Sequence, residues 1–203
     1  RIGKEILVRH ADHYRRLRNT LRYLLGALSD FDKKEIIDYS EMPEIERWVL
    51  NKVYKLSKKI IQFSENYQLG DIYREVYDFC NDDLSSFYFD IRKDTLYCDK
   101  KNSDKRQSCV LILNTILDAL LKWFAPILSF TTEEIYQLIS KNNKSIHLEK
   151  FLKFPEKFKD EKLVVKWSEL IKIRDVCNIS IEEKRASKEI GSSLEAELNI
   201  KLN

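Results

Sequence analysis

The most constraining feature of the sequence is the stretch 110–124, which is apolar almost all the way round a helix. At helical spacing, Val110, Leu113, Leu117 and Leu120 form one face, and Leu111, Ile112 and Leu121 fall on others. A helix that is apolar on nearly every side has to be covered on nearly every side. The stretch therefore predicts the central helix of a bundle, bent or ended by Pro126.

The remaining periodic segments predict an all-α helical bundle of five or six helices. Only 4 Gly and 3 Pro occur in 203 residues, as expected for long helices. Helices are predicted over 4–28, 43–70, 71–97 with a kink near Ser85–Ser86, 131–139 and 163–191. Pro43 suits a first turn, Asp71 an N-cap, and Thr131 with Glu134 a capping box.

The C-terminus has a different period. Residues 194–202 alternate apolar and polar, which predicts a strand that begins a short, truncated α/β segment; residues 146–148 are predicted to be a short extended piece. The expected domains are a bundle over 1–140, an irregular charged connection over 141–162, and a long helix with the start of the α/β subdomain over 163–203. Because the sequence opens on Arg1, we expect it to be a piece of a longer protein.

Charge and cysteine usage narrow the class of protein. The net charge is only +3, so any basic surface has to be local. No signal peptide or apolar run of membrane-spanning length is recognised, and no Cys-x-x-Cys pair occurs, so a cytoplasmic protein with reduced structural thiols is expected, with no membrane partner. His10 and His13 lie one turn apart without supporting ligands, so no metal site is predicted.

The opening helix carries two faces. Tyr14, Leu17, Leu21 and Leu24 recur at spacings of three and four and form an apolar stripe. Arg15, Arg18, Asn19 and Arg22 fall within an arc of about 100° beside that stripe. Guanidinium groups in a row suit bidentate contact with phosphates or base edges, but a solvated charged face has the same pattern. The pattern alone leaves both interpretations open.

The sequence carries no motif for catalysis. It has no Gly-rich phosphate loop, Gly-x-Ser-x-Gly or His-Glu-x-x-His pattern. The acidic pair Asp82–Asp83 occupies adjacent helical positions, whose side chains point apart. No catalytic residue is predicted.

Five collinear segments resemble the anticodon-binding domain of the isoleucyl-tRNA synthetase family. The first carries the Arg18-Asn19 pair, and the five together run over nearly the whole chain: Tyr14–Gly26, Glu46–Trp48, Ser86–Cys98, Leu117–Glu134 and Lys188–Ala196. Members of this family are class I aminoacyl-tRNA synthetases that attach isoleucine to its tRNA with ATP and Mg²⁺. The resemblance implies a domain that docks the anticodon stem-loop of isoleucine tRNA.

The family's catalytic motifs, its inserted editing domain and the zinc module at the C-terminus of many bacterial members are absent from this sequence. The resemblance therefore implies a fragment that is inactive alone, monomeric and without a cofactor of its own. ATP, Mg²⁺ and, where that module exists, Zn²⁺ belong to the full-length enzyme.

The resemblance also implies which residues touch tRNA. Arg18 is expected to contact a base with Asn19 beside it, and Arg15 and Arg22 to contact phosphates. Lys93 and Tyr97, and with them Arg92, correspond to a second anticodon-facing region. Arg92 and Thr95 depart from the family pattern there, and Trp48 and Trp123 lie on apolar stripes that indicate the core.

Two other functions remain compatible with the sequence. One is the equivalent bundle of a valyl-, leucyl- or methionyl-tRNA synthetase. The other is a helical protein-interaction scaffold without an RNA role, which predicts a groove lined by exposed apolar residues. An independent small enzyme would need a catalytic constellation, and none was found.

Overall fold

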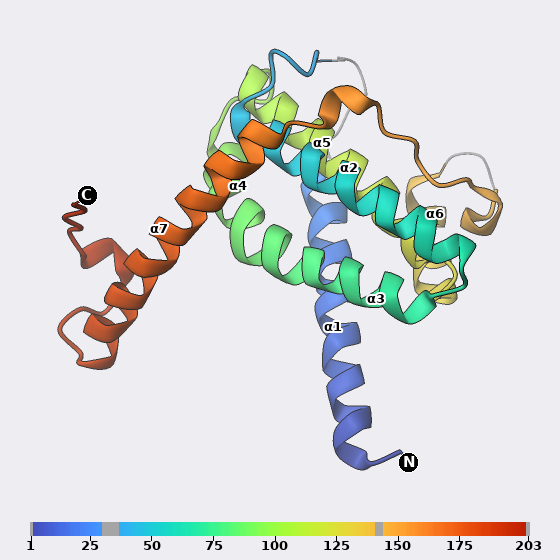
Figure 1. The fold of residues 1–203 in the computed structure, drawn as a ribbon, viewed down its shortest axis with the longest axis horizontal. Helices are drawn as coiled ribbons and strands as arrows, with labels where there is room; N and C mark the ends of the chain where they lie inside the picture. Colours follow the sequence, from blue (N-terminus) through green and yellow to red (C-terminus); the bar gives the residue numbers. More distant parts are fainter. Residues whose placement is uncertain (1, 30–36, 141–143, 202–203) are drawn as a thin grey trace. The chain divides into compact units, whose positions relative to one another are not determined.

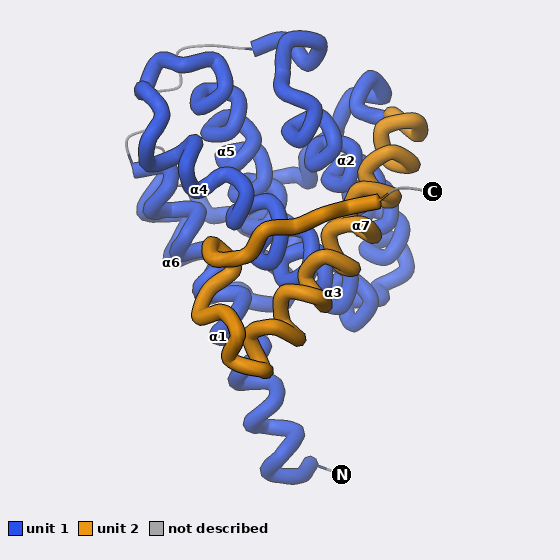
Figure 2. Tube along the Cα trace, turned by 90° about the vertical axis from the view of Figure 1, so that its left-hand side faces the viewer, with its two compact units in different colours: residues 1–159 blue, residues 160–203 orange. Residues whose placement is uncertain are grey.

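The computed structural model describes residues 2–29, 37–140 and 144–201. The chain divides into two compact units, residues 1–159 and 160–203, coloured separately in Figure 2. The described part of the chain is helical and contains no strand (Figure 1). The predicted all-α class is confirmed.

The first unit is built around α5. Its α-helices are α1 (Lys4–Ala27), α2 (Glu44–Glu65), α3 (Leu69–Asp78), α4 (Phe89–Cys98), α5 (Asp104–Phe124) and α6 (Ser129–Ile139). α5 contacts all five of the others, and its residues from Leu120 to Phe124 are buried. The prediction of a central helix is confirmed, and Trp48 and Trp123 are both in the core.

α5 is long and apolar enough to cross a membrane by length and composition. The prediction that the sequence holds no apolar run of membrane-spanning length was therefore wrong, because α5 has the length and composition of such a run. Two-thirds of the residues in its most apolar window are buried inside the protein, as expected for a core helix.

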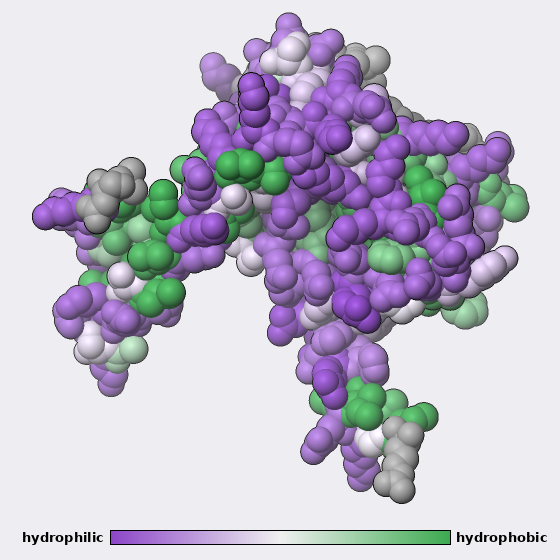
Figure 3. All heavy atoms as spheres, in the orientation of Figure 1, coloured by the Kyte–Doolittle hydropathy of each residue, from purple (hydrophilic) through white to green (hydrophobic). Residues whose placement is uncertain are grey.

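α1 is packed over only part of its length. Leu17, Leu21 and Leu24 are buried, which confirms the stripe that spacings of three and four predict for these leucines, whereas Tyr14 of the same stripe is 38% exposed. The N-terminal part of α1 extends beyond the other helices of the unit (Figures 1 and 2), and Ile6, Leu7 and Val8 are exposed there. Figure 3 shows these apolar side chains at the free end of the helix.

A single helical rod runs from α3 to α4 through a π-helix, η1 (Phe79–Tyr88). The predicted kink near Ser85–Ser86 falls within this π-helical stretch. Two predicted boundaries are wrong. α2 ends at Glu65 because Tyr67 takes a left-handed conformation (φ 56°), and α3 begins at Leu69, so Asp71 lies in its first turn and not at its N-cap.

The predicted capping box is also wrong. α6 begins at Ser129, so Thr131 and Glu134 both lie inside the helix. Their side chains bond to α1 instead: the Thr131 hydroxyl to Tyr14 and the Glu134 carboxylate to Arg18. Long-range partners therefore replaced the local caps that the sequence pattern offered.

The charged connection packs on the bundle up to Lys159. Residues 146–148 form a 3₁₀ turn, η2 (Ile146–Leu148), in place of the predicted extended piece, and η3 (Glu156–Phe158) follows. The Asn51 amide of α2 donates to the Phe158 carbonyl at 2.9 Å, and the rings of Tyr39 and Phe158 lie 5.2 Å apart. These contacts explain why the first unit extends past residue 140.

The second unit consists of α7 (Glu161–Ala186) and a short 3₁₀ turn, η4 (Ser193–Glu195). The Asp160 side chain caps α7 by accepting from the Leu163 amide at 3.0 Å. α7 ends before the predicted Gly191 because Lys188 takes a left-handed conformation (φ 60°). No strand occurs over residues 194–201, so the predicted α/β segment is wrong for the described part, since no second strand is present there to pair with it.

A buried ion pair joins α2 to α4 within the first unit. The carboxylate of Glu46 on α2 is fully buried and accepts from Nε and Nη2 of Arg92 on α4, at 2.6 and 2.5 Å. The hydroxyl of Tyr88 donates to the same carboxylate at 3.2 Å. Arg92, which the resemblance implies as a further tRNA contact, is instead buried in the core and bonded to Glu46, so that expectation is wrong.

Replacing Glu46 by Gln should lower the free energy of unfolding by about 3–5 kcal/mol, because the Arg92 charge stays buried without its partner. Urea unfolding followed by circular dichroism measures the change. The control is Asp90→Asn, which breaks the exposed Asp90–Lys93 pair and should cost less than about 1 kcal/mol. Equal effects from the two variants would contradict the structural role of this pair.

Candidate nucleic-acid interface

The candidate residues on α1 surround its solvent-facing side in a defined order. At about 100° per residue, Arg15 and Arg22 point between two flanks. Arg18 lies on the flank toward α6, and Asn19 lies on the flank toward η1 and α4. All four side chains are exposed. The arc predicted from the sequence is therefore divided in the structure: Arg15 and Arg22 face solvent, and Arg18 and Asn19 lie on opposite flanks of α1.

Arg18 is held by a cluster that joins α1 to α6. Its Nη1 donates to the Tyr14 hydroxyl at 3.3 Å and to Oε2 of Glu134 at 3.3 Å. The Tyr14 hydroxyl also bonds to Thr131 at 2.9 Å. These hydrogen bonds, from Thr131 first and then Arg18, lower the pKa of Tyr14. The structure therefore restrains this guanidinium.

Fewer contacts restrain the side chains of Arg15 and Arg22 than that of Arg18. Arg15 pairs with Asp12 one turn earlier on the same helix at 2.8 Å, and both side chains are largely exposed. Arg22 has no ion-pair partner within the described residues. Exposed pairs of this kind contribute little and are readily exchanged for another anion.

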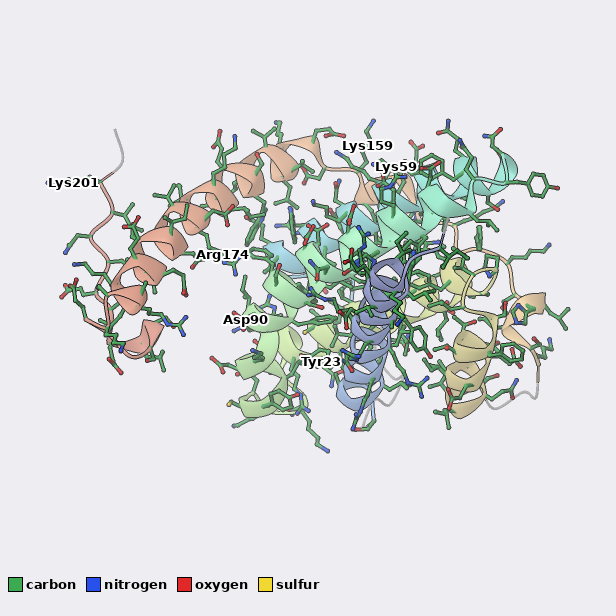
Figure 4. All side chains as sticks on the ribbon, turned by 90° about the horizontal axis from the view of Figure 1, so that it is seen from below. Tyr23, Lys59, Asp90, Lys159, Arg174 and Lys201 are labelled. Atoms are coloured by element: carbon green, nitrogen blue, oxygen red, sulfur yellow. The ribbon has the colours of Figure 1, made fainter. Side chains whose placement is uncertain are left out.

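An open pocket of about 370 Å³ lies on the other flank of α1. Arg16, Asn19 and Tyr23 line it from α1, and Asn81 and Lys93 line it from η1 and α4. Two of the six predicted contact residues, Asn19 and Lys93, come from motifs more than seventy positions apart and meet here. Figure 4 labels Tyr23 on α1 and Asp90 on α4, the helices on the two sides of this pocket.

The pocket combines aromatic walls with polar groups. The rings of Tyr23 and Phe89 lie 4.4 Å apart, and Tyr77 also lines the pocket. Arg16 donates from Nη1 to Oδ1 of Asn81 at 3.1 Å across it. Aromatic surface with amide and cationic groups is the combination that proteins use to hold unstacked bases.

The π-helix forms one wall of this pocket. Cys80, Asn81 and Ser85 of η1 line it, and the Ser85 hydroxyl donates to the Cys80 carbonyl five residues earlier at 2.8 Å. Thr20 on α1 approaches the same hydroxyl at 3.4 Å. π-helical turns frequently occur at functional sites, and this one brings its side chains against the arginine helix.

Lys93 and Tyr97 lie on the same side of the unit. Lys93 pairs with Asp90 at 2.7 Å, and this hydrogen bond raises its pKa. Tyr97 is 72% exposed and does not line the pocket. Tyr97 follows Lys93 by four residues on α4, so the two side chains lie on the same face of that helix.

Sequence reasoning missed Arg16 and Glu134. Arg16 belongs to the arginine run, and a helical wheel places it beside Asn19 on the pocket side. Glu134 was missed because its place three residues after Thr131 matched a capping box, which predicts a local partner.

No group of three or more side chains suited to a metal occurs among the residues that the structure describes. His13 stacks on Tyr77 with centroids 4.4 Å apart.

Known proteins provide an independent comparison. Residues 46–200 match the family described as the anticodon-binding domain of tRNA ligase. The chain is similar to isoleucine–tRNA ligases of Pelagibacter ubique (60% identical over the whole chain), Agrobacterium fabrum (42% over 97% of it) and Kosmotoga olearia (36% over the whole chain). It covers 23%, 20% and 22% of those relatives, so it spans about a fifth of their length.

Replacing Tyr23 by Phe should reduce the loss of stability at alkaline pH. The Tyr23 hydroxyl is buried without a hydrogen-bond partner among the residues that the structure describes, and burial raises its pKa to about 12. Because the folded-state pKa is raised, its contribution to stability is full below about pH 10 and is lost as the pH rises through about 12. Urea midpoints at about pH 8 and about pH 11 measure the difference.

The control for this change is Tyr67→Phe, at an exposed position. At neutral pH, Tyr23→Phe should not lower stability, because it removes an unpaired buried hydroxyl. A Tyr23 variant with the same alkaline loss as the unchanged chain would contradict this assignment.

Proposed function

Because the chain belongs to the family of anticodon-binding domains of tRNA ligases, we propose that it docks the anticodon stem-loop of isoleucine tRNA. The observation that carries this proposal is the meeting of Asn19 and Lys93 in one aromatic pocket beside the arginine face of α1. Anticodon loops present unstacked bases, and such a surface offers them both stacking and hydrogen bonds.

Each residue has a stated role in this proposal. Arg18 contacts a base edge on the flank toward α6, and Asn19 contacts a base at the pocket on the other flank. Arg15 and Arg22, between the two flanks, contact phosphates. Lys93 and Tyr97 form the second contact region, Lys93 at the pocket and Tyr97 on the exposed surface of α4. Exposed guanidiniums that are free or weakly paired support the phosphate role, since an incoming phosphate displaces little.

The proposal extends to the parent protein. We propose that it is an isoleucine–tRNA ligase, as its relatives are named, which acts as a monomer in the cytoplasm, where tRNA is charged. ATP, Mg²⁺ and any Zn²⁺ would serve its reaction elsewhere, because no residue of this chain is proposed to hold them. The chain alone would therefore bind tRNA without aminoacylating it.

Filter binding of the chain to isoleucine tRNA over a salt series tests the proposal. Affinity should fall as salt rises, because phosphate contacts release counterions. Arg18→Ala should weaken binding by about 1–3 kcal/mol, as expected for loss of a base contact. Arg22→Ala should weaken it less and reduce the salt slope by about 0.7 for the lost phosphate contact.

Two controls accompany this experiment. Arg9→Ala removes the same charge from the exposed first part of α1 and should have a smaller effect than Arg18→Ala. Valine, leucine and methionine tRNAs should compete more weakly than isoleucine tRNA. Salt-independent binding, or full affinity in the Arg18 variant, would refute the proposed function; equal competition by another tRNA would refute the isoleucine assignment alone.

A further inference from the structure

Arg18 differs from the other arginines of the arc in its ion-pair partner. Its partner Glu134 comes from a different helix, α6, whereas Arg15 pairs within α1. Both side chains of the Arg18–Glu134 pair are about half exposed, 49% and 59%. The pair thus lies on the surface where RNA would approach, and the carboxylate is accessible with the guanidinium.

The contacts of Arg18 occupy only one edge of its guanidinium. Nη1 donates to both Tyr14 and Glu134, while Nε and Nη2 have no partner within the described residues. The bond between Tyr14 and Thr131 fixes the phenol that Arg18 contacts. Arg18 therefore keeps donors for a ligand although its charge is already compensated.

We propose that Glu134 is a specificity-determining residue, which makes Arg18 favour an uncharged base edge over a phosphate. This inference rests on the proposed function of the chain. The Glu134 carboxylate lies 3.3 Å from Nη1 of Arg18, so it shares one guanidinium with any group that binds Nε or Nη2. A phosphate at that position is repelled by Glu134, whereas a neutral base edge gains the hydrogen bonds without this repulsion.

The three arginines then have different tasks. Arg22 has no ion-pair partner within the described part of the chain, and Arg15 pairs there with a carboxylate of its own helix, with no second group such as Tyr14 to hold it. Both are therefore available to contact phosphates. Arg18 is restrained and electrically compensated, so it contributes selectivity more than attraction. A carboxylate beside a cation on an RNA-binding surface would otherwise only weaken binding.

The test measures binding of the chain and its Glu134→Gln variant to two RNA hairpins over a salt series. One hairpin carries the anticodon stem-loop of isoleucine tRNA, and the other differs in a single anticodon base. Glu133→Gln is the matched control, since it removes the same charge from the adjacent residue. The Glu133 carboxylate bonds to Gln137, Ser145 and the Ile146 amide rather than to Arg18.

The Glu134 variant should bind the altered hairpin on the order of threefold more tightly, and should discriminate less between the hairpins, because the compensated charge becomes available to phosphate. Its salt slope should steepen by about 0.7 for one added phosphate contact. In an Arg18→Ala background the same change should have no effect on discrimination, since the coupling runs through Arg18.

Unchanged discrimination and slope in the Glu134 variant, or equal changes with both hairpins, would overturn this inference while leaving the proposed function standing. The same effect in the Glu133 control would also overturn it, because a general loss of negative charge would then be the cause. If the unchanged chain shows no salt-dependent binding of either hairpin, the proposed function fails and this inference fails with it.

Discussion

The structure of the first unit depends on the need to cover α5 on all sides. A helix that is apolar on nearly every side is stable only when nearly every side is removed from water, and five other helices pack around this one. α1, α4 and α6 are brought to fixed positions by that packing, and these helices carry the six predicted contact residues and Glu134, while α3 and η1 complete the pocket. The interface is therefore a by-product of core formation, on the outer faces of helices whose inner faces serve the core.

Sequence periodicity predicted the helices well because each has a strong apolar stripe, as in Leu17, Leu21 and Leu24 of α1. It failed where a local pattern had a distant competitor. Thr131 and Glu134 match a capping box, but α1 supplies them with partners about 115 residues away, and no local rule contains that information. The alternation after Leu194 predicts a strand, yet a strand requires a neighbour, which the described residues do not provide.

The same limits apply to the site. The arginine arc was visible in the sequence because a helix fixes the angles between its own residues. Its division into an α6 side and a pocket side was not, since it depends on how α6 and η1 pack against α1. Arg92 shows the reverse case: its exposed neighbour Lys93 lines the pocket, while Arg92, one position earlier, is turned inward to a buried carboxylate.

The π-helix has a consequence for the tolerance of this domain to insertions and deletions. α3, η1 and α4 form one rod, so the phase of its wide turns sets the direction in which α4 presents its side chains. Removing or adding one residue in η1 would rotate α4 by roughly a quarter of a turn about the rod axis. Arg92 would then lose its buried carboxylate and Lys93 its pocket at once, so the length of this segment is tied to both folding and recognition.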